Sequence, residues 1–423
     1  MKVSIIVPVY NCEQWLARCL DSIVEQTIDP FEIICIDDAS TDTSLEILMN
    51  YQKKYRNIVL LKSKVNQGAG NARNMGLQKA IGTYVCFMDA DDWYHSPTVL
   101  NTLFIASENN NALICGGNRA ICDKNGAIQS MCETVFTHEG FVNTYDLQES
   151  NSHGRYLYNR KMLIDNGIFF PKYRRYEDPS FLIRAHLEAN YIYCLPITVY
   201  MNHKRHFNMQ YTRSVTIDIL HGILDCVQIA SINNLNKLLK RFGDTMKSYE
   251  KYYMKYLYDG DEEIWEILQE IYQYYRKDER MSYINIHTKQ TIALNLRLYQ
   301  IEKTKFNAFV TNNNVLVYGA GKCGQKIIRR LKKMNVNLVG VAVSQKCKEN
   351  KSNDIHTDIH EIKEYVKLKN QINVLIAVYD TKIANEMIRI LKQYEFKNFA
   401  YFNYTELDID DFLIKSEENN DSI

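Results

Sequence analysis

The sequence has almost no excess of charge of either sign. Its 51 basic and 50 acidic residues give a formal net charge of +1 at pH 7. No field of one sign therefore attracts a polyanion, which argues against a general nucleic-acid binder. Small acidic ligands remain candidates.

Zinc, disulfide and membrane patterns are also missing. The 11 cysteines are an odd number, and no two of them have zinc-ligand or C-x-x-C spacing. Several lie inside apolar runs, so we interpret them as reduced core residues of a cytosolic protein. The chain runs from Met1 directly into a predicted strand, and no segment is predicted to be long and apolar enough to cross a bilayer. We expect a cytoplasmic protein, at most in peripheral contact with the inner face of a membrane.

A chain of 423 residues is too long for one ordinary core, and its patterns predict several domains. Strands alternate with helices over residues 1–215, and helical spacing dominates residues 216–312. A second α/β pattern occupies residues 313–405, and residues 406–423 form an acidic, asparagine-rich tail. There is no internal repeat. Either the helical or the C-terminal domain could support oligomer formation.

An apolar run that stops in carboxylates is the first candidate site. Residues 84–88 are apolar, and Asp89, Asp91, Asp92 and Trp93 follow. Such a run predicts a buried parallel strand, so the acids lie at its carboxyl end, where open α/β sheets bind ligands. Clustered carboxylates repel one another unless a cation shares them, and Mg²⁺ or Mn²⁺ prefers carboxylate and phosphate oxygens.

Two further polar groups follow predicted strands in the same way. The strand over residues 31–36 ends in Asp37 and Asp38, and the strand over residues 58–61 leads into a glycine-bearing loop with Arg73. Parallel strands bring such ends to one crevice. Carboxylates, an arginine fork and a cation are together what a nucleoside diphosphate requires.

At this point the residues resemble a known family, the family 2 glycosyltransferases with the GT-A fold. The resemblance covers residues 1 to about 215 and follows these motifs in order: Val7 to Asn11 with Glu13, Asp37 to Asp42, Gly70 to Gly76, Asp89 to Asp92, Leu157 to Arg160 and Glu177 to Phe181. It implies an α/β fold with a mixed GT-A sheet that binds a nucleotide sugar. The helical segment and a smaller Rossmann-like α/β domain would follow.

The resemblance also implies an activity, which is the transfer of a sugar from a nucleotide-sugar donor, commonly a UDP-sugar, with inversion and with Mn²⁺ or Mg²⁺. The acceptor would be a saccharide or a glycolipid in surface polysaccharide synthesis. The implied donor-binding residues are Pro8, Val9, Tyr10, Glu13, Asp38, Arg73, Asp89 and Ala90. Among them, Pro8, Tyr10 and Asp38 would surround the uracil, and Arg73 would close over the base. Asp91 would be the principal metal ligand, with Asp89 on the metal or the ribose.

Asp178 resembles the catalytic base of the family, with Glu177 as its supporting neighbour. An inverting displacement needs a carboxylate that takes the proton of the acceptor hydroxyl. Acids at the start of a predicted helix also have an ordinary explanation as helix caps. The motif context favours the base.

Other candidates have two interpretations each. His203 falls where some relatives place a residue on the metal or the phosphates, with His206 as the alternative, whereas a lone histidine is more often structural. Trp93, Arg155 and Tyr158 fit an acceptor platform and fit core packing equally well.

The C-terminal motif Gly319, Gly321 and Gly324 stands between a predicted strand and a predicted helix, where it could bind a nucleotide or merely allow a tight turn. The next strand ends in Ser344 without the acid of an NAD site, which argues against a dehydrogenase or an NAD-dependent epimerase. A sugar-nucleotide nucleotidyltransferase is the other rival. That class has a glycine-rich basic loop after the first strand, where this chain has Pro8 to Asn11.

Overall fold

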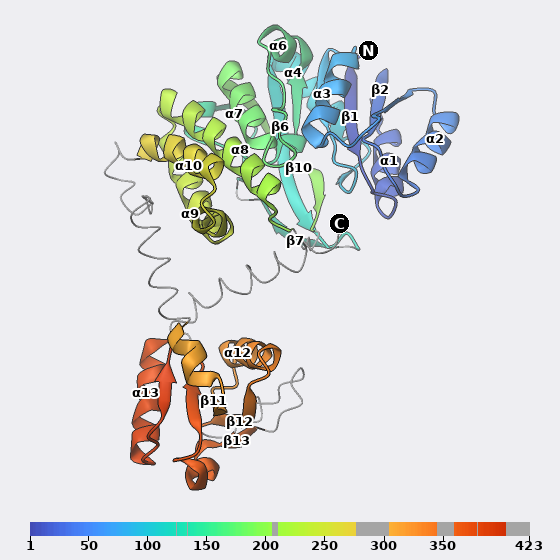
Figure 1. The fold of residues 1–423 in the computed structure, drawn as a ribbon. Helices are drawn as coiled ribbons and strands as arrows, with labels where there is room; N and C mark the ends of the chain where they lie inside the picture. Colours follow the sequence, from blue (N-terminus) through green and yellow to red (C-terminus); the bar gives the residue numbers. More distant parts are fainter. Residues whose placement is uncertain are drawn as a thin grey trace. The chain divides into compact units, whose positions relative to one another are not determined.

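The computed structural model describes residues 1–123, 125–132, 134–204, 210–275, 304–344, 359–378 and 380–402. The chain divides into two compact units (Figure 1). The first is Met1–Tyr256 with Asp261–Ile286, and the second is Leu257–Gly260 with His287–Ile423. Helices that the sequence assigned to a separate segment after residue 215 therefore belong in part to the first unit. The predicted acidic tail lies outside the described residues.

The first unit is built on a ten-stranded sheet. Its strands are β1 (Val3–Val9), β2 (Phe31–Asp37), β3 (Ile58–Lys62), β4 (Tyr84–Phe87), β5 (Trp93–Tyr94), β6 (Ile114–Cys122), β7 (Ile128–Met131), β8 (Gly140–Asn143), β9 (Tyr156–Asn159) and β10 (Tyr191–His203). The order is β3-β2-β1-β4-β9-β6-β10-β5, with β7 on β6 and β8 on β10. β3, β2, β1 and β4 are parallel, and β9 runs antiparallel between β4 and β6. This confirms the predicted mixed α/β sheet.

Helices cover both faces of this sheet. α1 (Leu16–Val24), α2 (Ser44–Lys54) and α4 (Val99–Asn110) share one apolar cluster with the side chains of Val3, Ile5 and Val7. α3 (Ala69–Lys79), α6 (Arg160–Asp165) and α7 (Asp178–Ala189) share another with Ile6 on the opposite side of β1. Because both faces of β1 are covered, every residue in it is buried, as its continuous apolar run predicts.

Two segments differ from the sequence-based expectation. The apolar run over residues 168–170 predicts a short strand at 168–171, but the structure has an irregular segment there. The side chain of Asn74 takes the place of a neighbouring strand: it accepts from the Phe170 amide (2.9 Å) and donates to the Phe170 carbonyl (2.7 Å). The second segment is β9, which enters the middle of the sheet although it has two tyrosines and is flanked by Arg155 and Arg160.

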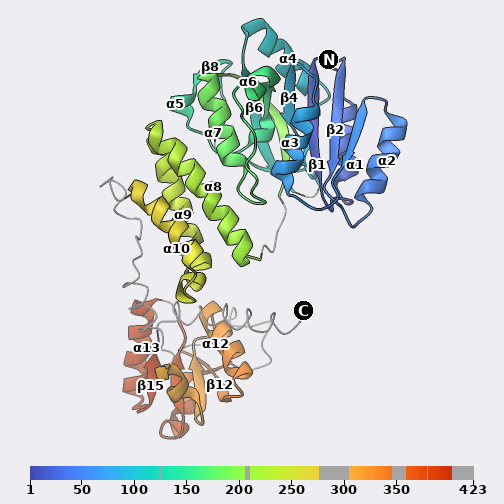
Figure 2. The same cartoon turned by 45° about the horizontal axis from the view of Figure 1, so that its top comes forward.

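α8 (Arg213–Ile232), α9 (Asn236–Tyr258) and α10 (Glu262–Tyr275) lie side by side (Figure 2). By length and composition alone, α8 is long and apolar enough to cross a bilayer, with a mean hydropathy of 1.5. The expectation that no segment passes this test is therefore wrong. Half of the apolar stretch of α8 is buried in the protein, and a core helix passes the same test.

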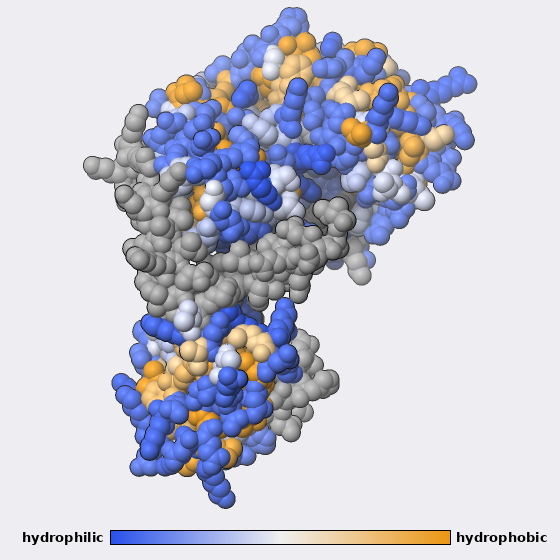
Figure 3. All heavy atoms as spheres, in the orientation of Figure 1, coloured by the Kyte–Doolittle hydropathy of each residue, from blue (hydrophilic) through white to orange (hydrophobic). Residues whose placement is uncertain are grey.

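Hydrophilic residues make up most of the face seen in Figure 3, with apolar residues in smaller groups between them.

The second unit is a parallel sheet between helices. Its strands are β11 (Asn314–Tyr318), β12 (Asn337–Val343), β13 (Ile359–Glu361), β14 (Asn373–Ile376) and β15 (Phe399–Tyr401), in the order β13-β12-β11-β14-β15. α12 (Lys322–Lys333) packs on one face and α13 (Thr381–Gln393) on the other (Figure 1). This is the small Rossmann-like sheet that the sequence predicts.

Candidate active site

The predicted donor residues meet where the order of the sheet changes direction. β1 lies between β2 and β4. The helices that lead from β1 to β2 and from β2 to β3 pack on one face of the sheet, and α3, which leads to β4, packs on the other. The carboxyl ends of these three strands carry Tyr10, Asp38 and Asp89. Open α/β sheets bind ligands at such a switch point. The strand order therefore brings these three residues to neighbouring strand ends, and their roles in donor binding stay predictions.

Asp38 holds the loop that precedes α3. Both of its carboxylate oxygens accept from the Gln67 amide at 3.0 Å, and Oδ2 also accepts from the Gly68 amide at 2.8 Å. Gly68 has a φ of +91°, a conformation that favours glycine. The Asp38 side chain is buried, so its visible role is to fix this loop at the end of β1 and β2.

The remaining residues near β1 divide into buried and exposed ones. Pro8 and Val9 are buried in the sheet, whereas Tyr10 is 44% exposed at its end. Glu13 accepts from the amide (3.0 Å) and the hydroxyl (2.7 Å) of Thr43. Glu13 thus joins the start of α1 to the start of α2, and the donor-binding roles of Pro8, Val9 and Tyr10 stay predictions.

Arg73 connects two acids that lie far apart in the sequence. Its Nη2 is 2.7 Å from Asp89 Oδ1 and its Nη1 is 2.9 Å from Glu177 Oε1. Burial disfavours the guanidinium charge, but Asp89 and Glu177 outweigh burial and raise the pKa of Arg73 above its ordinary value. This places Arg73 between the acids of the β4 tip and the start of α7, where it contacts both.

The three acids after β4 have different surroundings. Asp89 keeps 34% of its side chain exposed, Asp91 is half-buried, and Ala90 is buried beside them. Asp92 is only 1% exposed. The tip therefore presents Asp89 and Asp91, while Asp92 points into the protein.

Asp92 anchors the end of β10. Its carboxyl group accepts from the Tyr200 hydroxyl (2.8 Å), the Asn202 amide group (3.0 Å) and the His203 backbone amide (2.7 Å). Burial raises the pKa of Asp92 well above its ordinary value, and the charges of Asp91 and Asp89 add to this effect. Asp92 thus positions His203 at the acid tip.

His203 lies next to this tip as expected. It is 9% exposed, and its ring lies 5.6 Å from that of Trp15. His206 lies outside the described residues, so the choice between the two histidines stays a prediction.

The residues around the tip fit a divalent cation whose coordination the donor phosphates would complete. Mg²⁺ or Mn²⁺ is commonly held by one or two carboxylates together with substrate phosphates and water. Asp89 and Asp91 can supply those carboxylates. Among the described residues, no group of three or more acidic, histidine or cysteine side chains is arranged to hold an ion without a substrate.

Glu177 and Asp178 have opposite electrostatic environments. Burial raises the pKa of Glu177, against the influence of Arg73. Burial would also raise the pKa of Asp178, but His153 and Arg73 outweigh it and hold that pKa below its ordinary value. Asp178 keeps 37% of its side chain exposed at the start of α7. A charged, accessible carboxylate next to a buried, paired one is consistent with Asp178 as base and Glu177 as support.

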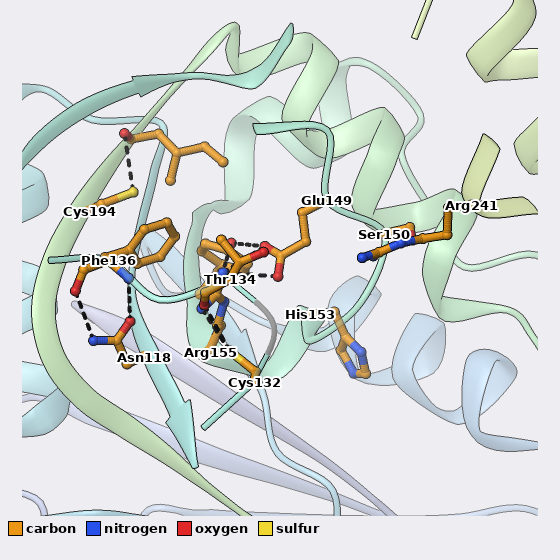
Figure 4. Close-up of polar contacts among 12 residues, drawn as sticks. Asn118, Cys132, Thr134, Phe136, Glu149, Ser150, His153, Arg155, Cys194 and Arg241 are labelled. Atoms are coloured by element: carbon orange, nitrogen blue, oxygen red, sulfur yellow. Dashed lines mark hydrogen bonds and ion pairs between the residues drawn. The ribbon is translucent and has the colours of Figure 1, made fainter. Parts of the chain in front are cut away.

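The predicted acceptor platform does not hold for Arg155 and Tyr158. Both are 0% exposed. Arg155 donates to both oxygens of Glu149 (2.9 and 2.8 Å) and to the Thr134 carbonyl (2.8 Å), as Figure 4 shows. Trp93 is 8% exposed, and the centroid of its ring lies 3.4 Å from the guanidinium carbon of Arg18. The packing interpretation of these three residues is the correct one, because their polar and aromatic surfaces are already covered.

The C-terminal glycines form a tight turn. Gly319 has a φ of +127°, and a Cβ on Gly324 would lie 1.8 Å from the Gly319 carbonyl oxygen. Gly321 is the N-cap residue just before α12, and a Cβ added to it would meet no atom within 4 Å. Close packing explains Gly319 and Gly324, whereas Gly321 leaves room for a ligand.

Sequence reasoning missed two residues of the site. Tyr200 accepts from the Asp89 amide (3.2 Å) and donates to Asp92, and His153 Nδ1 lies 3.5 Å from Asp178 Oδ2. No local pattern marks either residue, because their partners lie far away in the chain.

Comparison with known proteins gives a family match for part of the first unit. Residues 4–167 match the model of glycosyl transferase family 2. The poly(ribitol-phosphate) beta-glucosyltransferase of Bacillus spizizenii is 36% identical over 196 residues, which are 45% of this chain and 30% of that protein. The poly(ribitol-phosphate) beta-N-acetylglucosaminyltransferase TarS of Staphylococcus aureus is 30% identical over 207 residues, which are 47% of this chain and 35% of TarS.

A crystal structure of TarS in complex with UDP has a TM-score of 0.52 and 22% identity, and the match covers 67% of this chain and 83% of that one. This likeness shows a shared fold. The chain spans about a third of the length of the two relatives in sequence. Over residues 4–167 the chain matches glycosyl transferase family 2, which confirms the resemblance that its sequence motifs predict.

Proposed function

We propose that the first unit is an inverting glycosyltransferase that moves a sugar from a UDP-sugar to a hydroxyl group of a saccharide or lipid-linked acceptor. The observation that carries this proposal is the ion network Asp89–Arg73–Glu177 with Asp178 beside it. The network supports the proposal because Glu177 shares Arg73 with Asp89, and Asp178, which follows Glu177, keeps 37% of its side chain exposed. The relatives named above act on poly(ribitol-phosphate), which supports a role in cell-surface polymer synthesis.

Each residue has a defined task in this reaction. Asp178 accepts the proton of the acceptor hydroxyl while the oxygen of that hydroxyl attacks the anomeric carbon. The bond from that carbon to the diphosphate breaks, and its electron pair leaves with the diphosphate. Asp89 and Asp91 would hold Mn²⁺ or Mg²⁺, and the charge of such an ion would stabilise the leaving diphosphate. Tyr10 would contact the base of the nucleotide.

The test offers the protein a panel of nucleotide sugars with and without Mn²⁺, and measures released nucleotide and slow donor hydrolysis. We expect metal-dependent binding and hydrolysis of at least one UDP-sugar. If no donor shows metal-dependent binding or hydrolysis, the proposal is wrong.

Two variants separate the proposed roles. Asp91→Asn should abolish metal-dependent donor binding. Asp178→Asn should leave donor binding intact and slow transfer by about 10²- to 10⁴-fold, the usual contribution of a general base. Equal loss of donor binding in both variants would contradict the role of Asp178.

A further inference from the structure

One buried histidine lies directly behind the proposed base. His153 belongs to the short helix η1 (His153–Arg155), and its Nδ1 is 3.5 Å from Oδ2 of Asp178. The His153 residue is 6% exposed, while the Asp178 side chain is 37% exposed. The histidine therefore contacts the carboxylate from the protein side, and part of the Asp178 side chain stays exposed to solvent.

The His153 ring is held by aromatic neighbours. The centroid of the ring lies 6.2 Å from that of Phe87 and 5.6 Å from that of Phe170. Phe170 is itself stacked on Phe181 at 3.9 Å, and Phe181 belongs to α7, the helix that carries Asp178. The same aromatic cluster thus fixes the ring and the helix of the base.

The backbone of His153 is fixed as well. Its carbonyl accepts from the Tyr158 hydroxyl at 2.8 Å. The next residue, Gly154, has no room for a side chain, because a Cβ would lie 2.6 Å from the ring of Tyr200. Figure 4 shows the His153 ring apart from the pair of Arg155 and Glu149 that anchors the end of the segment.

The polar contacts of the ring are one-sided. Among the described residues, Nε2 of His153 is buried and has no hydrogen-bond partner. Nδ1 faces Asp178 alone. A histidine kept only for packing would leave both nitrogens without a task, whereas here one nitrogen is aimed at the one carboxylate that the reaction needs.

We propose that His153 is a positioning residue that orients the carboxylate of Asp178 for proton abstraction, an inference that rests on the function proposed above. Nδ1–H faces Oδ2, which turns Oδ1 toward the acceptor. The acceptor O–H bond breaks, and its proton passes to Oδ1. The electron pair of the acceptor oxygen forms the new bond to the anomeric carbon as the diphosphate leaves. A contact of 3.5 Å is long for a hydrogen bond, but such contacts in catalytic groups commonly shorten when substrates bind.

Several charged or titratable groups share the surroundings of Asp178. They are Arg73 from α3, Asp89 from the β4 tip, Glu177 and Tyr176 before α7, Tyr158 from β9 and Cys226 from α8. His153 and Arg73 lower the pKa of Asp178, against burial and the charge of Asp89. If His153 is removed, that pKa should rise. The acidic limb of the transfer rate should then move to higher pH, because Asp178 must be ionised to act.

The test compares His153→Phe with His153→Asn. Phenylalanine keeps a ring between Phe87 and Phe170 but removes the donor, and asparagine keeps an N–H group near the Nδ1 position. His186→Phe is the matched control, because His186 is also buried in the first unit with an unpartnered Nε2 but does not contact Asp178.

We expect His153→Phe to lower kcat about 10- to 100-fold, the usual effect of losing a group that orients a ligand or reacting residue, with the donor KM unchanged. The acidic limb of the pH–rate profile of His153→Phe should move to higher pH. His153→Asn should restore most of kcat, and His186→Phe should keep the acidic limb of the wild type. The inference would be overturned if His153→Phe had the kcat and the acidic limb of the wild type. It would also be overturned if both His153 variants lost UDP binding as well as kcat. If His153→Phe does not fold, the smaller His153→Leu carries the same test. Absence of transfer by the wild type would instead overturn the proposed function.

Discussion

Arg73 and Glu177 lie 104 residues apart in the chain, and their side chains meet at 2.9 Å inside the protein. Their side chains are 5% and 10% exposed. The same guanidinium contacts Asp89, so the start of α7 is tied to the end of β4 by one residue. The geometry of the proposed base relative to the donor acids therefore depends on Arg73.

Replacement of Arg73 by methionine should lower both stability and activity. Removing one partner of a buried ion pair commonly costs about 3–5 kcal/mol, because the remaining charge stays buried. Glu177 would be that charge. Urea unfolding measures the loss, and donor turnover should fall with it.

Two controls define this effect. Arg73→Met with Glu177→Gln should recover part of the stability, since the unpaired charge is gone, but should not recover activity. Lys161→Met removes the exposed pair with Asp165, whose side chains are 83% and 53% exposed, and should change stability by less than about 0.5 kcal/mol. A similar loss in Lys161→Met would show that burial does not set the cost.

His186 should make the first unit sensitive to acid. Burial, with the charge of Arg155, lowers the pKa of His186 to about 3, whereas the unfolded chain has a value near its ordinary 6.5. A histidine with a lowered folded pKa binds fewer protons when folded, so stability is lost as pH falls from about 6.5 to about 3. At pH 5 the loss is about 2 kcal/mol.

The measurement is urea unfolding of the wild type and of His186→Phe at pH 7 and pH 5. The wild type should lose about 2 kcal/mol more than the variant over this range. Equal losses in the two proteins would mean that His186 can charge in the folded state.

The sequence predicted the donor side of the site because its signal is local. β1, β2 and β4 are continuous apolar runs that end in polar residues, and parallel pairing alone brings Tyr10, Asp38 and Asp89 together. Nothing in these arguments requires knowledge of a distant partner.

The packing of Arg155, Asp92 and Tyr158 was not predictable in the same way. Arg155 is fully buried against Glu149, and Asp92 accepts from groups at the end of β10, about 110 residues later. β9 carries Tyr158 into the centre of the sheet between strands that are far from it in sequence. Such pairings depend on the tertiary fold and leave no periodic pattern.

Arg155→Met should destabilise the first unit without changing acceptor affinity. Glu149 is 5% exposed and would keep a buried, unpaired charge, so the loss should be about 3–5 kcal/mol. The acceptor KM of the folded protein should stay unchanged, because Arg155 is fully buried. Steady-state kinetics below the unfolding temperature measures the acceptor KM, and urea unfolding measures the loss of stability. A higher acceptor KM with unchanged stability would restore the acceptor role that the sequence allowed.

The C-terminal glycines can be separated by a matched pair of substitutions. Gly324→Ala places a Cβ 1.8 Å from the Gly319 carbonyl, so the backbone must shift, at a cost of about 1–3 kcal/mol. Gly321→Ala meets no atom within 4 Å and has an ordinary φ of −73°, so its effect should stay within about 0.5 kcal/mol. Hydrogen exchange of the α12 amides in the full chain reports both effects, since these amides open with the second unit.

The same pair separates packing from nucleotide binding. If the turn binds a nucleotide through the start of α12, then NAD or UDP should slow α12 exchange in the wild type, and Gly321→Ala should remove that protection because its methyl group occupies the open space. If the glycines serve packing alone, neither nucleotide changes exchange, and only Gly324→Ala differs from the wild type. Protection that persists in Gly321→Ala would place the nucleotide elsewhere in the second unit.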